Sequence, residues 1–144
     1  MKFKARILVT GLLLVAGAAF AADATDPTVK AWQELMDANG GAVKTLGGMA
    51  GDKMPFDAAA AEAAKAALVA SSAEIEAKFK TMATDPASKA SPDIWTNWDD
   101  FVAKGNALSA AAAAHDVTSL ETLQAGMAGV GGACKDCHMK YKLQ

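Results

Sequence analysis

The sequence is poor in aromatic residues, proline, histidine and cysteine. Only 6% of its 144 residues are aromatic, and it has four prolines, two histidines and two cysteines. A structural zinc site takes about four ligands, usually cysteine and histidine, and the whole chain holds only two of each. A typical domain has about 100 to 200 residues. We therefore expect a single domain without a structural zinc site.

β-Strands and basic stripes are also missing. No segment alternates apolar and polar residues with β-branched side chains over a useful length, so we expect no strand. No basic stripe runs through residues 22–144, which argues against nucleic acid or an anionic membrane as a partner. The prolines stand where helices could start or connections could run, and the segments between them are typical of helices. They are Pro27, Pro55, Pro86 and Pro92.

Residues 1–21 have the pattern of an export signal. Three cations precede an apolar run at 7–19, and small residues then occupy the two positions that signal peptidase reads. The run is short for a membrane span of about 20 residues, and no twin-arginine pair precedes it. We predict a Sec-type signal cleaved after Ala21, with no stable membrane insertion afterwards. Cleavage would change the formal net charge from −2 to −5.

The next segments predict three helices. The first begins at Asp26-Pro27, because an acidic N-cap precedes a proline at the first helical position. The second runs from Asp57 to Phe79, and a polar loop follows at about 82–92. The third ends near His115. We expect its imidazole to interact favourably with the C-terminal end of the helix rather than to bind a metal.

The fourth helix has the clearest pattern. Thr118 and Glu121 match a capping box, in which each side chain binds a free main-chain amide. Apolar residues then recur at steps of three and four, both cysteines among them: Leu120, Leu123, Met127, Val130, Cys134, Cys137 and Tyr141. Four helices with short connections predict an all-α fold, an antiparallel up-down-up-down four-helix bundle. Its many alanines leave little bulk at the centre, and a large flat apolar ligand would fill that space.

The motif Cys134-Lys135-Asp136-Cys137-His138 is C-x-x-C-H, the attachment sequence of c-type haem. Thiols three residues apart share one helical face, so both can add to the vinyl groups of neighbouring pyrrole rings. His138 is then held beside the iron as an axial ligand. A disulfide or thioredoxin-like redox pair is the main alternative, but that motif is typical of a βα unit and no strand is expected. We predict one covalent haem c.

Several segments resemble the class II c-type cytochromes, that is cytochrome c′ and its low-spin relative cytochrome c-556. The segment before the motif and Tyr141 after it resemble that family's last helix. Residues 92–95 resemble the entry to its third helix, and residues 33–36, 46–49 and 55–57 resemble its first helix and following turn. The resemblance implies a left-handed bundle, often dimeric, with haem between the helices near one end. It also implies that Gln33 and Trp95 touch the haem rim.

The family resemblance places Met36 on the other side of the iron. In the low-spin branch a methionine of the first helix is the second axial ligand, and Met36 is the matching residue. Cytochromes c′ usually carry arginines where this chain has Trp32 and Lys142, so both positions depart from a typical c′ pocket. The competing interpretation is that Met36 only fills the core, as methionine commonly does.

These features predict a periplasmic monohaem electron carrier with His138 and Met36 as axial ligands. The alternative is a five-coordinate, high-spin cytochrome c′ that binds nitric oxide or carbon monoxide. Neither mechanism needs an acid, base or nucleophile, so we do not expect an enzyme. The expected partners are redox proteins, whose identity the sequence does not give, and a second copy of the chain.

Overall fold

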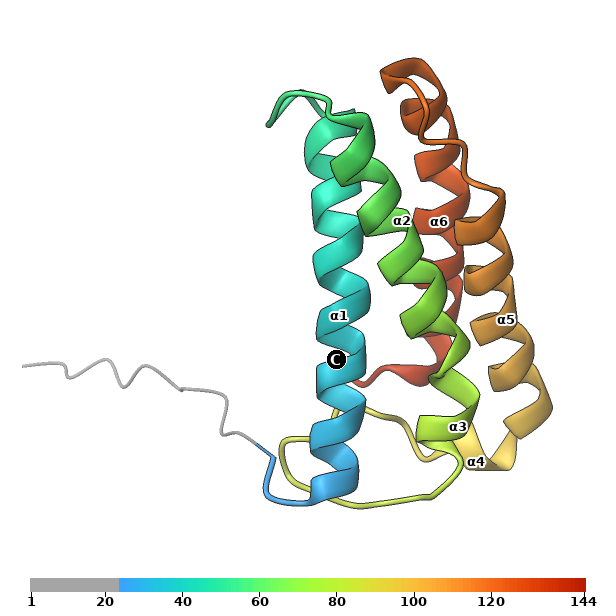
Figure 1. Cartoon of the computed structure of the whole chain (residues 1–144). Helices are drawn as coiled ribbons and strands as arrows, with labels where there is room; N and C mark the ends of the chain where they lie inside the picture. The colour runs from blue at the N-terminus through green and yellow to red at the C-terminus, as the bar shows by residue number, and fades with distance from the viewer. Residues whose placement is uncertain (1–23) are drawn as a thin grey trace, which may run out of the picture.

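The computed structural model describes residues 24–144, so the signal peptide predicted at 1–21 lies outside the described residues. Four helical columns lie side by side and run alternately up and down (Figure 1), which confirms the predicted all-α bundle. Within residues 24–144 there is no strand, only an isolated bridge. The helices are α1 (Pro27–Ala50), α2 (Ala58–Ala73), α3 (Ile75–Phe79), α4 (Asp93–Thr96), α5 (Trp98–Ala114) and α6 (Leu120–Tyr141).

Acidic caps start the first two long helices, as the sequence predicted. The Asp26 carboxylate accepts hydrogen bonds from the main-chain N–H groups of Thr28 and Val29 at 2.7 and 3.1 Å. Asp57 caps α2 by accepting from the Ala60 N–H at 2.8 Å. Because the first amides of a helix lack partners within the helix, these carboxylates fix where α1 and α2 begin.

The capping box predicted for the last helix was wrong by one residue. The N-cap of α6 is Ser119, and its reciprocal partner is Thr122 rather than Glu121. The Thr122 N–H donates to Ser119 Oγ at 3.1 Å, and the Ser119 N–H donates to Thr122 Oγ1 at 3.2 Å. Thr118 is held elsewhere, because its N–H and its hydroxyl both donate to the Asp116 carboxylate.

The predicted helix from Asp57 to Phe79 is interrupted at Glu74, which separates α2 from α3. The hydroxyl of Ser72 donates to the Val69 carbonyl at 3.1 Å, and the Glu74 N–H bonds to the Ser71 carbonyl three residues back. Serine hydroxyls that bond to preceding carbonyls often bend helices. Below this interruption α3 continues the column of α2 to the lower end of the bundle (Figure 1), where Phe79 packs against Trp32 and Phe101.

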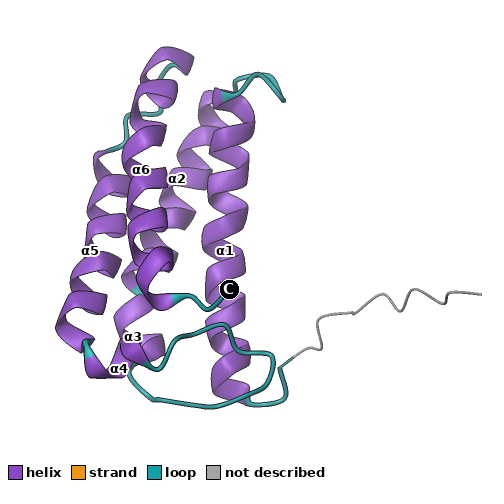
Figure 2. Cartoon of the chain, turned by 180° about the vertical axis from the view of Figure 1, so that it is seen from behind, coloured by secondary structure: helices purple, strands orange, loops and turns teal. Residues whose placement is uncertain are grey.

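The loop at 80–92 is tied to both ends of the described chain. Figure 2 shows it passing across the lower end of the bundle. The Asp85 carboxylate accepts from the N–H groups of Thr25 and Asp26 at 2.7 and 2.9 Å and from the Ala87 N–H at 2.8 Å. These main-chain hydrogen bonds lower the pKa of Asp85. On the other side, the bridge between Ala90 and Lys142 joins the loop to the segment after α6.

Asp85→Asn should lower the free energy of unfolding by an amount that depends on pH. The lowered pKa means that Asp85 stabilises the fold fully above the ordinary carboxyl pKa of about 4 and loses this effect as pH falls below it. The variant should therefore unfold more readily than the wild type at neutral pH, and the difference should shrink in acid. Urea unfolding at several pH values measures this, and a difference that stays constant with pH would contradict the assignment.

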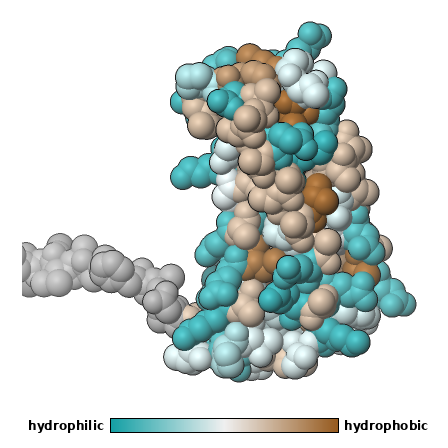
Figure 3. Space-filling model, in the orientation of Figure 1, coloured by the Kyte–Doolittle hydropathy of each residue, from teal (hydrophilic) through white to brown (hydrophobic). Residues whose placement is uncertain are grey.

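The core is built from a few large side chains spaced by alanine. The largest fully buried side chains include Leu46, Met49, Leu68 and Leu123. On the surface, the face seen in Figure 1 has mostly weakly apolar, pale brown residues across its middle (Figure 3), where alanine-rich α2 lies. None of the described helices is long and apolar enough to cross a membrane.

Candidate functional site

A cavity of about 900 Å³ opens at the end of the bundle where α1 begins and α6 ends. Its walls come from α1, α3, α4, α5, α6, residues 86–90 of the long loop and Lys142 after α6. Cavities that bind cofactor-sized molecules usually measure about 300 to 1,000 Å³. The apolar walls include Val29, Trp32, Val43, Ile75, Phe79, Phe101 and Leu108.

The last turns of α6 bring the three residues of the sequence motif to this cavity. Cys134, Cys137 and His138 all line it, and both cysteines are half-buried free thiols. Burial is the main effect that raises the pKa of each thiol. Both groups therefore stay protonated at neutral pH, which disfavours the thiolate chemistry of a redox pair. The expected sharing of one helical face is confirmed.

The surroundings of His138 favour the neutral imidazole that a metal ligand needs. The residue as a whole is exposed, yet its pKa is lowered, chiefly by desolvation of the ring and then by the positive charge of Lys142. A lowered pKa favours the neutral imidazole, and only a neutral imidazole has a free nitrogen lone pair to bind a metal.

The facing wall on α1 carries Met36. Residues 24–144 contain six methionines, and Met36 is the one that lines the cavity. The apolar residues of α1 differ in burial here, because Leu46 and Met49 are fully buried while Met36 and Val43 are half-buried at the cavity. A helix face that borders a cavity rather than the core explains this difference.

Aromatic residues close the inner end of the cavity. Trp32 is 3% exposed, stacks on Phe79 with ring centroids 4.9 Å apart, and donates from Nε1 to the Lys78 carbonyl at 2.8 Å. At position 32, where the resemblance implies an arginine, this chain therefore has an indole that packs on Phe79 and whose N–H is hydrogen-bonded. Gln33, the next residue, lines the cavity, and its side-chain amide donates to the Ala87 carbonyl at 3.3 Å.

Trp95 is placed behind this layer rather than at the cavity. It is not among the residues that line the cavity. Its ring lies 5.4 Å from the Trp32 ring, centroid to centroid, and its Nε1 donates to the Phe79 carbonyl at 2.8 Å. The structure thus gives Trp95 a supporting contact to Trp32 and Phe79, and the haem contact implied by family resemblance has no counterpart in the cavity lining.

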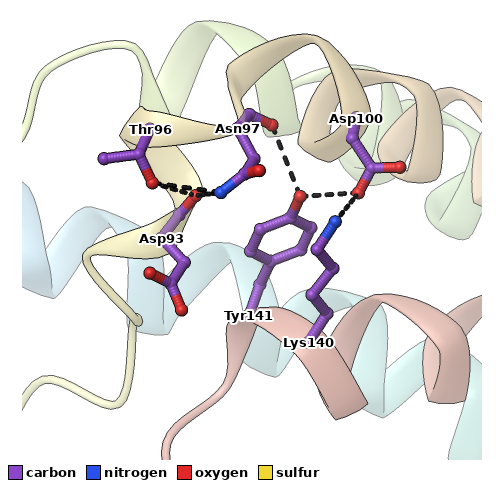
Figure 4. Close-up of polar contacts among 6 residues, drawn as sticks. All are labelled: Asp93, Thr96, Asn97, Asp100, Lys140 and Tyr141. Atoms are coloured by element: carbon purple, nitrogen blue, oxygen red, sulfur yellow. Dashed lines mark hydrogen bonds and ion pairs between the residues drawn. The ribbon is translucent and has the colours of Figure 1, made fainter.

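Tyr141 fixes the end of α6 against the start of α5 (Figure 4). Its hydroxyl donates to the Asp100 carboxylate at 2.6 Å, and Lys140 Nζ donates to the same oxygen at 2.9 Å. The bond from Tyr141, then that from Lys140, lowers the pKa of Asp100, while burial above all raises the pKa of Tyr141. The phenol therefore stays protonated and holds the helical turn that carries His138.

Asn39 adds an unpaired polar group to the cavity lining. It lies three residues after Met36 on α1 and is 6% exposed. Its Oδ1 accepts from the Ser71 hydroxyl at 2.6 Å, whereas its buried Nδ2 has no partner. A buried donor without a partner costs roughly 1 to 3 kcal/mol. Such a group is more stable when an acceptor enters the cavity.

These residues fit the haem c that the motif predicts. Two thiols share a helical face, an imidazole with a lowered pKa follows them, and a thioether from α1 lines the same apolar cavity of suitable size. In residues 24–144 no three His, Cys, Asp or Glu side chains gather closely enough to hold a metal ion by themselves. Cys134 and Cys137 could hold the porphyrin, with His138 and Met36 on its iron.

Sequence reasoning missed several residues that line the cavity. Asn39 was detectable in principle, because it is a polar residue on the stripe of Met36 and Val43. Phe101 and Lys104 belong to α5, which meets α6 only in the folded chain, and residues 86–90 have no periodic pattern. No local signal in the sequence could have placed these segments at the site.

Comparison with known proteins agrees with this site. The chain matches the family described as Cytochrome C' over residues 27–142. It is 34% identical over 135 residues to cytochrome c-556 of Agrobacterium fabrum. This alignment covers 91% of this chain and 88% of that relative. It is also 31% identical over 143 residues to cytochrome c′ of Rhodopseudomonas palustris. That alignment covers 96% of this chain and 97% of the relative.

A solved structure leads to the same assignment. Cytochrome c′ from Rhodopseudomonas palustris is similar to this chain with a TM-score of 0.73 and 26% identity, over 83% of this chain and 98% of that one. Names from both the c′ and the c-556 branch occur among the relatives. The chain belongs to the cytochrome c′ family, whose members carry covalently bound haem c.

Proposed function

We propose that the protein is an exported electron carrier in which Cys134 and Cys137 hold haem c and His138 and Met36 bind its iron. The observation that supports this proposal is that Met36, alone among the six methionines of residues 24–144, lines the cavity that Cys134, Cys137 and His138 also line. Haem c supplies a one-electron couple, and an imidazole–thioether ligand pair raises its reduction potential.

The protein's own residues then have positioning roles. Met36 and His138 belong to two long packed helices, so neither ligand needs to move far when the charge changes by one electron. Trp32, Phe79 and Phe101 exclude water from the inner wall. With both axial positions filled by side chains, small molecules would have to displace Met36 before they could bind.

We also propose that the protein acts in the periplasm and is not an enzyme. The pattern of residues 1–21 supports export, and covalent haem c supports the same compartment. The site as described offers ligands and apolar walls. The proposed mechanism transfers an electron and moves no proton or chemical group.

The visible spectrum of the reduced, haem-loaded protein tests the ligand assignment. We expect sharp, split low-spin bands that do not change when carbon monoxide is added. The competing function, a five-coordinate cytochrome c′ that binds nitric oxide or carbon monoxide, predicts a broad high-spin spectrum that shifts promptly with the gas. That second result would overturn the electron-carrier proposal and leave haem attachment at Cys134 and Cys137 intact.

A further inference from the structure

A second depression, of about 480 Å³, lies beside the C-terminal end of α6. His138 and Lys142 border both this depression and the main cavity. In Figure 2 the segment after α6 ends beside α1, and its residues form part of the depression. We call this surface the lysine face; it is lined by Lys89, Lys135, His138, Met139, Lys142, Leu143 and Gln144.

The charge of the lysine face is opposite to that of the chain. Its lining contains three lysines and no carboxylate side chain, although the whole chain has a formal net charge of −2. Among residues 24–144, neither Lys135 nor Lys142 forms an ion pair with a carboxylate. Lys89 Nζ donates to the main-chain oxygen of Gln144 at 3.0 Å. Lys135 and Lys142 are therefore available to an external anion, while Lys89 is held against the end of the chain.

The same surface also exposes apolar side chains. Four large apolar residues are exposed among residues 24–144, and two of them, Met139 and Leu143, lie here with 70% and 46% exposure. An apolar centre with a polar rim is the usual composition of a protein–protein interface. Methionine also packs readily against different partner surfaces because its side chain is flexible and polarisable.

We propose that the lysine face docks the acidic surface of a redox partner protein, with an apolar partner residue against Met139 and Leu143. This proposal rests on the proposed electron-carrier function, and it names the chemistry of the partner. The partner's one-electron centre loses one electron as this protein gains one, or the reverse, and no bond forms or breaks. Docking at this surface places the partner next to His138, which borders both the depression and the cavity.

An acidic protein fits this surface better than the other anionic macromolecules. The three lysines surround a small apolar centre rather than forming a stripe along a helix or a strand, as a nucleic-acid backbone would require. The chain's excess of acidic residues repels any anionic partner at long range, so binding depends on short-range contacts with the lysines and the apolar centre. A compact acidic patch with an apolar residue on a folded protein can make both kinds of contact at this small surface.

Electron-transfer kinetics with an acidic redox protein test the proposal. Reduced flavodoxin is mixed with the oxidised haem-loaded protein in a stopped-flow instrument at low and high salt. The test variant is Lys135→Glu/Lys142→Glu, and the matched control is Lys44→Glu/Lys53→Glu, which makes the same charge change at exposed positions outside the lysine face. Lys135→Glu alone serves as a second test variant, because Lys135 does not line the main cavity.

We expect the second-order rate of the double test variant to fall about tenfold at low salt, because steering by a charged surface changes association rates by that order or more. The control should stay within about twofold. The test and control rates should converge at about 1 M salt, where the screening length is only ~3 Å. Met139→Ser/Leu143→Ser should slow the reaction at both salt concentrations, since apolar contacts are not screened.

Two results would overturn the proposal that the lysine face docks an acidic redox partner. One is an equal loss of rate in the test and control variants, which would show that only net charge matters. The other is no loss in the test variants. The reduced spectrum of each protein is recorded first, so a high-spin wild type would contradict Met36 ligation separately, while the comparison between variants would still report on docking.

Discussion

The Met36→Ala variant is expected to lose the low-spin spectrum of the reduced protein and to bind carbon monoxide. Met36 supplies the methionine thioether of the cavity lining, so no other methionine of residues 24–144 is in place to replace it. Alanine is too short to reach across the cavity and carries no donor atom. Absorption spectra of the reduced variant, titrated with carbon monoxide, measure both effects.

The size of the effect follows from competition between Met36 and the gas. A minor state with the thioether displaced would be populated at about 0.1 to 10% if it lies a few kcal/mol above the ligated state. The apparent affinity of the wild type for the gas is lowered by that fraction. We therefore expect Met36→Ala to bind carbon monoxide about 10- to 1,000-fold more tightly than the wild type.

Two further variants separate ligation from packing. Met36→Leu keeps nearly the same side-chain volume but removes the sulfur, so it should behave as Met36→Ala does. Val43→Ala removes bulk from the same wall of the cavity, seven residues further along α1, and keeps the sulfur. Its spectrum should stay low-spin. A low-spin, gas-indifferent Met36→Leu protein would show that Met36 only fills space.

Local signals in the sequence predicted most of the fold. The starts of α1 and α2 were predicted because an aspartate side chain can reach only the amides that follow it closely in the chain. The capping box of α6 was misplaced because Thr118, Ser119 and Thr122 all carry suitable hydroxyls, and the bond from Thr118 to Asp116 decides between them. The interruption at Glu74 was missed for a similar reason, since serine hydroxyls are compatible with both a straight and a bent helix.

The site was predictable where its residues belong to one motif. Cys134, Cys137 and His138 lie within five consecutive residues, and the cavity contains all three. Of the residues implied by resemblance, Gln33 and Met36 line the cavity and Trp95 does not, while their contacts with haem stay predictions. The position of Trp95 outside the cavity lining depends on how α4 packs against the aromatic cluster. This is a tertiary contact that no spacing in the sequence encodes. The lysine face is likewise assembled from α6, the long loop and the C-terminal segment.

The sequence predicted the position of His115 at the end of the third long helix but not its contact with the last helix. It ends α5, as predicted, but its buried ring reaches α6, where Nε2 lies 2.8 Å from the Leu123 carbonyl and Nδ1 has no partner. The imidazole therefore joins α5 to α6 rather than only meeting its own helix end. The ring also lies directly over Gly126, at a position of α6 where a side chain would collide with it.

Gly126→Ala should therefore destabilise the protein strongly. A Cβ atom at this position would lie 2.1 Å from His115 Cδ2 and 2.5 Å from Nε2, so the buried ring would have to move and lose its bond to Leu123. Overpacking a core and leaving a buried polar group unpaired together cost about 2 to 6 kcal/mol. The free energy of unfolding of the haem-loaded protein, measured with urea, tests this value.

Gly129→Ala is the matched control on the same helix. A Cβ atom there would meet nothing within 4 Å, and alanine favours a helix over glycine by about 0.5 to 1 kcal/mol, so this variant should be slightly more stable than the wild type. Adding His115→Ala to Gly126→Ala removes the ring that causes the collision. The double variant should consequently be more stable than the sum of the two single effects predicts. Simple additivity, or equal stability of the two glycine variants, would mean that His115 does not pack on Gly126.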